Sequence, residues 1–584
     1  MPIRLSRFLL AIATILASST VCAAAQPLER LLPDTTRASF SISNAQHLED
    51  GWSRTRLSQL VDVPAMKPFL DDAEARFRRA LGGLDDLADI DADDLRAAAS
   101  GEIRLATVES AAGSAEVAAL VDVTGKSDAV AELAAKIDAG LSDRGATHAT
   151  ETIAGATLHT YTWTAEGSTR RTSYFVKNEV LCVASDGALA KTVLARFDGA
   201  AGKGLADVPA YRDVIDRCLA AEGDASPQVQ WFVQPLELQR LLTEDDQEFE
   251  RKHGLDGVKA VGGTVRFGVG QFDAVARLAV YAPPPRTRAL RLLSLKDDKP
   301  LEPQSWLIED IDSYATANLE FTNVLDDIGP LFDDLAADGI DGTFEDILGD
   351  LKDEEVGPGV DIRKELMPIL GPRITIVSDH LAGARSDGGV SLIAIETSNE
   401  AKAADVVKRL MRDDPQVTRI TLPGYPFDLW QVADDPDATM PNMGIVVANG
   451  HVLAASHADL IRKILLAPAD APKLAAAADY KQAAAERDSL GGAPLAVWMF
   501  SRTRRDYRTT YEMVRAGKLD EMESMYADGL RRLFGHDEER LAGMPRLDFT
   551  LLPAFSVVEP FLKPVGALVY NQPTGWMVVA FVGK

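Results

Sequence analysis

Cysteine and long apolar runs are scarce in this chain. Three cysteines occur among 584 residues, and only Cys182 and Cys218 lie beyond the N-terminal segment. Two thiols are too few for a four-cysteine zinc site, and they leave open either one disulfide or two small buried apolar residues. After the first 25 residues no run approaches the roughly 18 apolar residues of a membrane-spanning helix, so we expect no integral membrane segment in the mature chain.

Positive charge is also in short supply. Lys and Arg number 61 against 88 Asp and Glu, which gives a net charge of −27. If Arg4 and Arg7 are removed with the N-terminal segment, the balance becomes 59 against 88 and the net charge −29. A chain of this sign repels phosphate backbones and anionic lipid surfaces. The sequence therefore predicts that the protein binds no nucleic acid.

Recognisable catalytic motifs are missing. None of the eight histidines forms an H-x-x-x-H or H-E-x-x-H pair, and neither a G-x-S-x-G turn nor a G-x-x-x-x-G-K-[ST] loop occurs. Ser378, Asp379 and His380 are the residue types of a hydrolase triad, but sequence neighbours rarely meet in triad geometry. The sequence names no catalytic residue and no cofactor, and it favours a non-enzymatic protein.

The N-terminus carries the clearest local signal. Arg4 and Arg7 form a charged start, Phe8 to Leu16 an apolar run, and Ala23 to Ala25 a small-residue cleavage site. The apolar run is too short to cross a bilayer, which requires about 20 residues, and Cys22 lacks the small preceding residue of a lipoprotein signal. We therefore predict a signal peptide over residues 1–25 and export to the periplasm or the extracellular space.

The rest of the chain contains an internal repeat. The segment VLCVASDGALAKTVL, from Val180, is similar to HVLAASHADLIRKIL, from His451, and aligns Ser185 with Ser456. Further pairs follow in the same order at nearly the same offset: Gly101 with Gly371, Leu120 with Leu392, Gly155 with Gly424, Tyr211 with Tyr480, and Trp231 with Trp498. Similarity at so long a period indicates duplicated structural units. Because the matched residues are apolar, glycine or aromatic, the repeat predicts a shared fold and no shared active site.

The repeat divides the chain into segments. We expect a first repeat over residues 26–295, a Pro-rich linker over 296–306 and a second repeat over 307–584. In each repeat, short alternating strands joined by turns are mixed with amphipathic helices. This pattern is typical of an α+β fold, and it predicts two similar tandem lobes, each a mainly antiparallel sheet covered by helices.

The second repeat carries extra residues near 505–540. Tyr507, Tyr511 and Val514 recur at helical spacing, and so do the apolar residues from Met522 to Leu533, with an interruption near Gly517. The pattern predicts a helical insertion. Two interpretations remain open: the helices cover a sheet face, or they cap a cleft between the lobes or bind a partner.

One acidic stretch resembles part of a calcium-binding loop. Counted from Asp334, oxygen ligands fall at loop positions one, five and twelve, with Asp338 and Glu345 as the later two and Gly339 at position six. Ala336 occupies position three, where a ligand belongs. We therefore expect an ordinary acidic loop, with calcium bound by Asp334, Asp338 and Glu345 as the alternative.

The order of these features resembles an exported bacterial family. The features are the signal peptide, a strand after LLPDTT and after IEDIDS, the GEI approach to a strand, and LADVPAYRDV before a strand with tryptophan. They are similar to the family of domain of unknown function 3352, over most of the mature chain. The resemblance implies an envelope location and a duplicated α+β fold, and it carries no known activity, cofactor or catalytic residue.

These observations lead to one functional hypothesis and two alternatives. The leading hypothesis is an exported, non-enzymatic protein of the cell envelope that binds another envelope protein or a small ligand. The first alternative is an exported hydrolase with its site in one lobe or between the lobes. The second is a calcium-dependent module that uses the acidic loop.

Overall fold

The computed structural model describes residues 27–80, 94, 97–165, 167–199, 202–223, 225–243, 247–381, 389–434, 441–491, 494–519 and 547–584. The predicted signal peptide, with Cys22, and residues 520–540 of the predicted helical insertion lie outside this range. The strands of the described residues form a single sheet of 21 strands. None of the described helices is long and apolar enough to cross a bilayer.

The strands of the first repeat occupy one half of this sheet. They are β1 (Thr36–Ile42), β2 (Ile103–Glu109), β3 (Ala115–Asp122), β4 (Thr147–Ile153), β5 (Ala156–Ala165), β6 (Ser168–Lys177), β7 (Val180–Ala184), β8 (Val229–Val233), β9 (Ala260–Val269) and β10 (Phe272–Tyr281). Their spatial order is β4-β5-β6-β7-β3-β2-β1-β8-β9-β10, and every neighbouring pair is antiparallel.

The strands of the second repeat follow the same plan. They are β12 (Ser313–Leu319), β13 (Leu370–His380), β14 (Gly389–Thr397), β15 (Val417–Ile420), β16 (Leu429–Val432), β17 (Gly444–Ala448), β18 (His451–Ala455), β19 (Val497–Ser501), β20 (Val565–Gln572) and β21 (Gly575–Gly583). Their order is β15-β16-β17-β18-β14-β13-β12-β19-β20-β21. The short strand β11 (Leu295–Lys296), which overlaps the first residue of the predicted linker, pairs with the end of β12.

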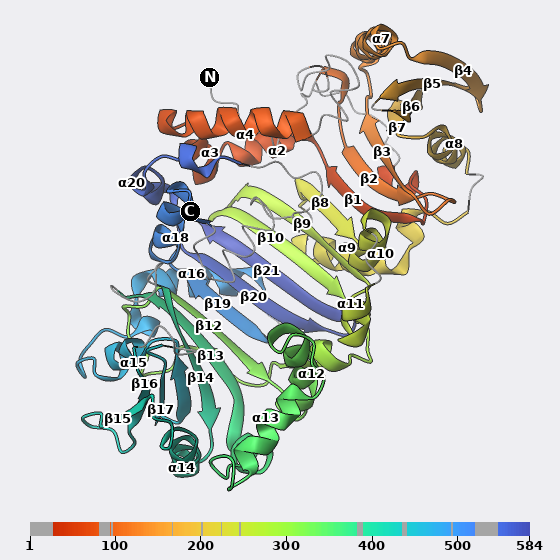
Figure 1. The fold of residues 1–584 in the computed structure, drawn as a ribbon. Coiled ribbons are helices and arrows are strands. Elements are labelled where there is room, and N and C mark those ends of the chain that lie inside the picture. Colours follow the sequence, from red (N-terminus) through yellow and green to blue (C-terminus); the bar gives the residue numbers. More distant parts are fainter. Residues whose placement is uncertain are drawn as a thin grey trace.

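The two halves are joined edge to edge. Strand β10 pairs with β21 along its whole length, from Phe272 opposite Gly583 to Tyr281 opposite Gly575. The prediction of two tandem lobes, each with a sheet of its own, is therefore wrong, because both repeats share one open antiparallel sheet (Figure 1). The pairing has a physical reason. An unpaired edge strand exposes a row of backbone N–H and C=O groups, and here each repeat covers the edge of the other.

The landmark serines make the same hydrogen bonds in both repeats. The Val117 N–H donates to Ser185 Oγ at 2.9 Å, and the Ser391 N–H donates to Ser456 Oγ at 2.9 Å. Each serine directly follows a strand, β7 or β18, and lies just before a helix, α8 (Gly187–Arg196) or α15 (Ala458–Leu465). The similarity of the two sequence segments therefore reflects equivalent positions in the shared sheet.

One tryptophan pair is displaced by a residue. Trp231 lies in β8 and Trp498 in the equivalent strand β19. The indole N–H of Trp498 donates to Tyr480 Oη at 3.2 Å. In the first repeat the equivalent bond, to Tyr211 Oη at 2.9 Å, comes from the side chain of Gln230. Gln230 is thus the counterpart of Trp498. Because successive strand residues point to opposite faces, the two tryptophans lie on opposite sides of the sheet.

One face of the sheet is covered by helices along both repeats. These are α8 and α9 (Pro209–Glu222) in the first repeat, and α15 and α16 (Ala478–Leu490) in the second. A single buried cluster runs beneath them and includes Leu120, Phe232, Leu392 and Phe581. We call this the covered face. On the opposite face, α7 (Ser127–Asp143) and α14 (Glu400–Met411) pack only on the outer strands.

The remaining helices border the middle of that opposite face (Figure 1). In the first repeat they are α2 (Ala45–Trp52), α3 (Arg56–Val61), α4 (Lys67–Ala80), α10 (Pro235–Leu242) and α11 (Glu248–Lys252). In the second they are α12 (Val324–Ala336), α13 (Thr343–Lys352), α17 (Thr503–Asp506), α18 (Arg508–Arg515) and α20 (Phe555–Val558). Several of these helices begin after a residue whose side chain caps the first turn. At the start of α2, for example, the Asn44 side chain accepts a hydrogen bond from the His47 N–H at 3.0 Å.

The two cysteines are separate and unbridged. Cys182 lies in β7 and Cys218 in α9, and both are buried as free thiols. Burial raises the pKa of the Cys218 thiol to about 12, and it also raises the pKa of the Cys182 thiol. The sequence left open either a disulfide or two small buried residues, and in the structure Cys182 and Cys218 are small buried residues.

Candidate functional site

The middle of the face opposite α9 and α16 is aliphatic across both repeats. Cross-strand pairing aligns its residues in two rows, because alternate residues of each strand point to the same side. The first row is Phe40, Trp231, Gly263, Leu278, Val578, Val569, Val497, Ala317, Ile374 and Ile395. The second is Ile42, Val229, Val265, Ala276, Ala580, Ala567, Met499, Ala315, Ile376 and Ile393. We call these the two apolar rows.

The apolar rows are partly open to solvent. Met499 and Ile376 each keep 42% of their surface exposed and Ile393 keeps 41%. Figure 1 shows the central strands from this side, with the bordering helices arranged around them. Neighbouring strands lie about 4.8 Å apart, so the segment from Val229 to Ile393 extends roughly 40 Å. Aliphatic surface of this extent is unusual on a soluble protein and typically marks a binding site.

The chemistry of this surface is limited to apolar contact. The backbone N–H and C=O groups of the central strands take part in ladders on both sides, as in β20 between β19 and β21. The side chains of the rows are aliphatic apart from Phe40 and Trp231, and none carries a charge. The surface therefore suits a long apolar ligand and offers no free strand edge for pairing.

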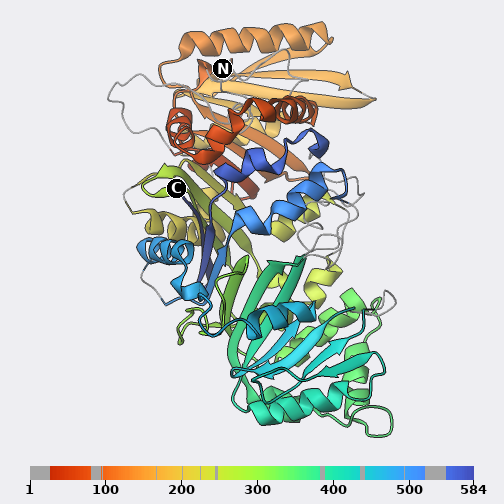
Figure 2. The ribbon, with the colours of Figure 1, turned by 90° about the vertical axis from the view of Figure 1, so that its left-hand side faces the viewer.

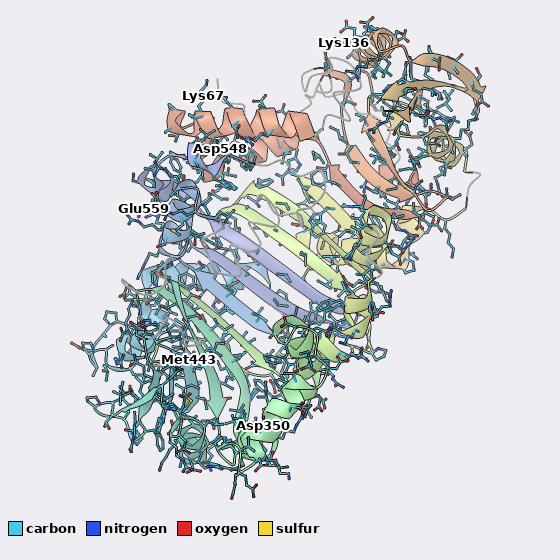
Figure 3. The ribbon with its side chains drawn as sticks, viewed as in Figure 1. Lys67, Lys136, Asp350, Met443, Asp548 and Glu559 are labelled. Atoms are coloured by element: carbon cyan, nitrogen blue, oxygen red, sulfur yellow. The ribbon has the colours of Figure 1, made fainter. Side chains whose placement is uncertain are left out.

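Helices from both repeats meet at the border of this surface. Leu60 and Leu70 of α3 and α4 pack with Val558 of α20 and Tyr511 of α18, and Figure 2 shows these N-terminal and C-terminal segments side by side. The Tyr511 hydroxyl donates to the Pro553 carbonyl at 2.9 Å. Polar and charged side chains project from the border, including those of Lys67 and Asp350, which lie on opposite sides of the open surface (Figure 3).

A row of hydroxyl groups follows one side of the apolar rows. Ser501, Ser313, Ser378 and Ser391 are direct cross-strand neighbours in β19, β12, β13 and β14. At the equivalent positions the first repeat has Val233, Ala38, Thr107 and Val117. The second repeat therefore has a hydroxyl group at each of these four positions, whereas the first repeat has one, on Thr107.

A buried charge network adjoins this serine row. The Lys463 ammonium bonds to Asp379 at 2.5 Å, Arg505 contacts Asp312 at 2.7 Å, and His380 Nδ1 lies 2.6 Å from Asp312 Oδ2. Asp312 and Asp379 are 2% and 1% exposed in their side chains, and burial raises the pKa of Asp379. With Asp310, which contacts both cations, the network holds three carboxylates against two permanent positive charges.

The Asp312–His380 pair has the orientation of the aspartate–histidine pair of a hydrolase triad. A triad requires a serine hydroxyl on the second ring nitrogen. Here the Asp312 carboxylate is shared, because it contacts both His380 Nδ1 and the Arg505 guanidinium. Ser378 and Asp379, the neighbours of His380 in sequence, point to opposite faces of β13. Asp312 and His380 therefore belong to the same ion network as Arg505 and Asp379.

The acidic loop lies at the border between the repeats. Asp334 accepts from the Lys252 ammonium and from His253 Nε2, each at 2.6 Å, and these partners belong to the first repeat. Asp338 is exposed in the loop, and Glu345 pairs with Arg363 at 2.5 Å. The structure does not bring the three carboxylates together. Across the described part of the chain, no group of three or more His, Cys, Asp or Glu side chains is placed to hold a metal ion.

Adjacent Asp333 organises this loop instead. Its buried carboxylate accepts from the Gly342 and Phe344 N–H groups, each at 2.7 Å. These bonds close the turn between α12 and α13 with protein atoms alone. The contacts of Asp334 with Lys252 and His253 then attach the loop to α11.

Comparisons of the chain with protein family models, with curated proteins and with solved structures found no match.

The apolar rows were not identified from the sequence. The sequence feature that corresponds to them is a strand segment such as WMVVAFV, from Trp576, in which the residues that point to either face of the strand are apolar. Such runs are typical of strands covered on both faces. In β21 the side chains on one face of the strand, including Met577 and Phe581, pack in the core. Those on the other face, including Val578 and Ala580, lie in the open rows.

Proposed function

We propose that this protein is an exported, non-enzymatic binding protein of the cell envelope, and that the two apolar rows hold the acyl chain of a lipid. The observation that carries the proposal is the continuous aliphatic surface formed jointly by both repeats. The predicted signal peptide supports the location. The resemblance to an exported family of envelope proteins points the same way.

The composition of the rows favours a lipid chain over a protein partner. Centres of protein–protein interfaces are enriched in Trp, Tyr and Arg, whereas these rows consist mainly of Val, Ala, Ile and Leu. Trp231 is the only tryptophan or arginine among them. A flexible hydrocarbon chain needs apolar area and no directional partner, and its burial is worth about 0.8 kcal/mol per CH₂ group.

Charge favours a single bound lipid over attachment to a membrane surface. The mature net charge of −29 opposes approach to an anionic bilayer. The serine row offers hydroxyls for the polar end of one lipid molecule, while the charge network beside it contains more carboxylates than permanent cations. A neutral glycerol or ester group suits that border better than a phosphate.

A fluorescent fatty-acid probe tests the proposal. We expect saturable binding to the purified mature protein, and competition by a monoacylglycerol of the same chain length. Met499→Glu and Ile376→Glu should each weaken probe binding by about tenfold, because a charge within an apolar contact loses its hydration. Both side chains are more than a third exposed in the folded protein, so these changes should leave the fold intact.

Leu219→Glu is the matched control. Leu219 has 37% of its surface exposed and lies on α9, which packs on the covered face. This variant should bind the probe like the natural protein. Equal loss of binding in all three variants, or no saturable binding at all, would contradict the proposal.

A further inference from the structure

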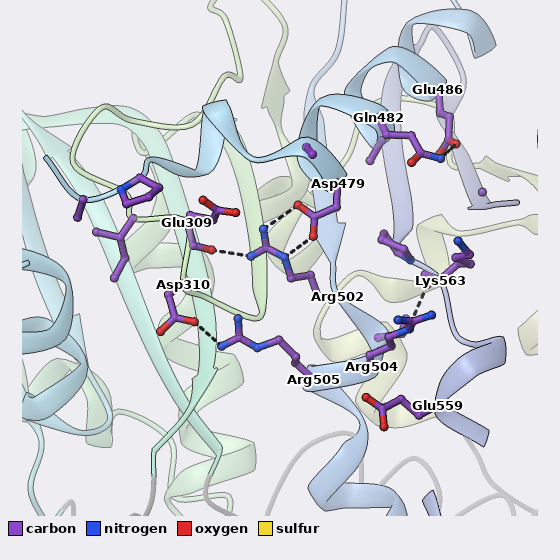
Figure 4. Close-up of a pocket in the computed structure, with 18 of the residues that line it drawn as sticks. Glu309, Asp310, Asp479, Gln482, Glu486, Arg502, Arg504, Arg505, Glu559 and Lys563 are labelled. Atoms are coloured by element: carbon purple, nitrogen blue, oxygen red, sulfur yellow. Dashed lines mark hydrogen bonds and ion pairs between the residues drawn. The ribbon is translucent and has the colours of Figure 1, made fainter. Parts of the chain in front are cut away.

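A cavity of about 900 Å³ lies beside α16, at the ends of β19 and β21. One wall is the face of α16 that carries Asp479, Gln482 and Glu486. The opposite wall carries Arg504 and Lys563 (Figure 4). The volume is within the range of small-molecule sites. None of these residues belongs to the apolar rows, so the cavity is a separate feature of the second repeat.

Glu486 is a buried acid without a cation bound to it. It is 6% exposed, and its Oε1 accepts from Gln482 Nε2 at 2.9 Å. Among the described residues it forms no ion pair. Burial raises the pKa of its carboxyl group, and the Gln482 hydrogen bond and the charge of Lys563 offset part of that rise. Gly583 makes room for it, since a Cβ at that position would lie 2.6 Å from Glu486 Oε1. The carboxyl group therefore lines the cavity with unused capacity for a positive partner.

The first repeat fills the equivalent place with its own cation. The alignment of Tyr211 with Tyr480 places Arg217 opposite Glu486 and Asp213 opposite Gln482. The Arg217 guanidinium forms an ion pair with Asp213 and donates to the Val280 carbonyl at 3.1 Å and to the Trp576 carbonyl at 3.3 Å. The second repeat has the acid in place of the base. A positively charged group of a ligand can therefore occupy, beside Glu486, the place that the Arg217 guanidinium occupies in the first repeat.

The opposite wall is cationic. Arg504 is oriented by the Leu562 and Pro560 carbonyls, at 3.0 and 3.4 Å, and among the described residues neither it nor Lys563 forms an ion pair with a carboxylate. Glu559 also lines this part of the cavity (Figure 4). Two cations against one carboxylate leave this wall positive.

Most of the other charged side chains of the cavity are paired with protein groups. Arg502 binds Asp479 through two hydrogen bonds, at 2.6 and 2.9 Å. Lys463 and Arg505 both bind Asp310. The lining also includes Lys584, which donates to the Gly270 carbonyl at 2.7 Å. The backbone carbonyl of Glu309 accepts from Arg502 at 2.7 Å, and within the described part of the chain the Glu309 carboxylate forms no ion pair.

We propose that this cavity binds a short peptide with free ends. The ammonium group of the peptide pairs with Glu486, and its carboxylate pairs with Arg504 and Lys563. Small apolar residues between the walls, among them Ala467, Pro468 and Pro472, contact the middle of the peptide. Charge-assisted hydrogen bonds at both ends of the ligand are stronger than neutral ones and select for a zwitterion.

Calorimetric titration of the whole mature protein tests this site with three matched peptides. They are Ala-Ala-Ala, its N-acetylated form, which lacks the ammonium group, and its C-terminal amide, which lacks the carboxylate. We expect the free peptide to bind at least about tenfold more tightly than either blocked form. Free alanine distinguishes the source of the zwitterion: affinity equal to that of Ala-Ala-Ala would assign the site to amino acids and overturn the assignment to peptides.

Two variants separate the two ends. Glu486→Gln should weaken the free peptide about tenfold and leave the N-acetylated peptide unchanged. Arg504→Gln changes an exposed side chain, and it should weaken the free peptide while leaving the amide unchanged. Arg412→Gln, at the C-cap of α14, is the charge-matched control and should bind like the natural protein. Equal affinity for all three peptides, or equal loss with the control variant, would overturn the proposal, and no result here depends on lipid binding.

Discussion

The two repeats build the same part of their core from opposite chemistry. In the first repeat, Glu222 at the end of α9 has a fully buried side chain, within 2.7 Å of Arg277 and 3.1 Å of Arg266. Thr264, opposite Arg277 in the β9–β10 ladder, donates its hydroxyl to the same carboxylate at 2.9 Å. The core at this point is an ionic cluster.

In the second repeat the same place is apolar. Leu568 and Val579 are paired in the β20–β21 ladder where the first repeat pairs Thr264 with Arg277. Both are buried, and Tyr570 lies beside them. Gly491 takes the place of Glu222, and a Cβ there would lie 2.4 Å from the Tyr570 hydroxyl oxygen.

The difference shows that one backbone arrangement accepts either solution. A buried ion cluster is worth little more than well-packed apolar residues, because desolvation offsets the attraction between the charges. It is nevertheless costly to break, since a lone buried charge keeps the desolvation cost and loses its partner. The two repeats should therefore differ in their response to single changes more than in their stability.

The largest expected effect comes from Glu222→Ala. This change leaves Arg277, which is 6% exposed, without its buried carboxylate, and it should lower the free energy of unfolding by about 3 to 5 kcal/mol. Urea denaturation followed by circular dichroism would measure the loss. Exchange of all members together, as Glu222→Ala, Thr264→Leu, Arg266→Tyr and Arg277→Val, should recover most of it. A fourfold variant as unstable as the single variant would contradict the equivalence of the two clusters.

The displaced tryptophans give the next largest effect. Trp498 is completely buried on the covered face, so Trp498→Ala should cost about 3 to 5 kcal/mol of unfolding free energy. Trp231→Ala should cost clearly less, because that side chain lies in the open apolar rows. The same denaturation experiment compares the two variants. Only Trp231→Ala should also weaken the fatty-acid probe, and equal destabilisation would show that Trp231 is a core residue.

Glu486→Gln should produce a smaller effect that depends on pH. Burial raises the pKa of Glu486 in the folded protein above the ordinary value of a glutamate side chain. The folded state therefore holds the proton more tightly, and stability falls as pH rises from the unfolded pKa through the folded pKa. The variant lacks this loss. Its melting temperature should exceed that of the natural protein at pH 8, with the difference disappearing near pH 4; a constant difference would exclude titration of Glu486 as the cause.

The smallest effect is expected at the acidic loop. The Lys252 and His253 hydrogen bonds lower the pKa of Asp334, so the stability that they provide is present above the unfolded pKa and is lost as pH falls through the folded pKa. Asp334→Asn should reduce the melting temperature slightly at neutral pH and less at acid pH. Millimolar calcium should leave the natural protein unchanged. A calcium-dependent rise of several degrees, abolished by Asp334→Asn, would instead assign the loop to metal binding.

Local features were predictable because they depend on neighbouring residues. The alternation of apolar residues indicated strands, and Tyr211 and Tyr480, matched in the sequence, occupy equivalent places on α9 and α16. The match of Trp231 with Trp498 was displaced by one residue. In a strand one residue exchanges the two faces, so sequence similarity alone placed the two side chains on the same side incorrectly.

The candidate surface depended on contacts that sequence patterns do not contain. Val578 and Ala580 belong to a strand that is apolar on both faces. Nothing in the local sequence distinguishes the face that packs in the core from the face that stays open. The same holds for Asp334, whose loop spacing suggested calcium ligands, while Lys252 and His253, its actual partners, lie some eighty residues earlier.

The sequence by itself determined the rhythm of strands and helices, the duplication and the strongly acidic charge, since each of these follows from composition and short-range periodicity. The tertiary structure alone decided that β10 pairs with β21 and that the two repeats share one sheet. Pairing between strand edges is made by backbone groups, which every residue except proline carries alike. Side-chain pattern can therefore mark a strand, but the choice of its neighbour depends on how the whole chain covers its edges and buries its apolar faces.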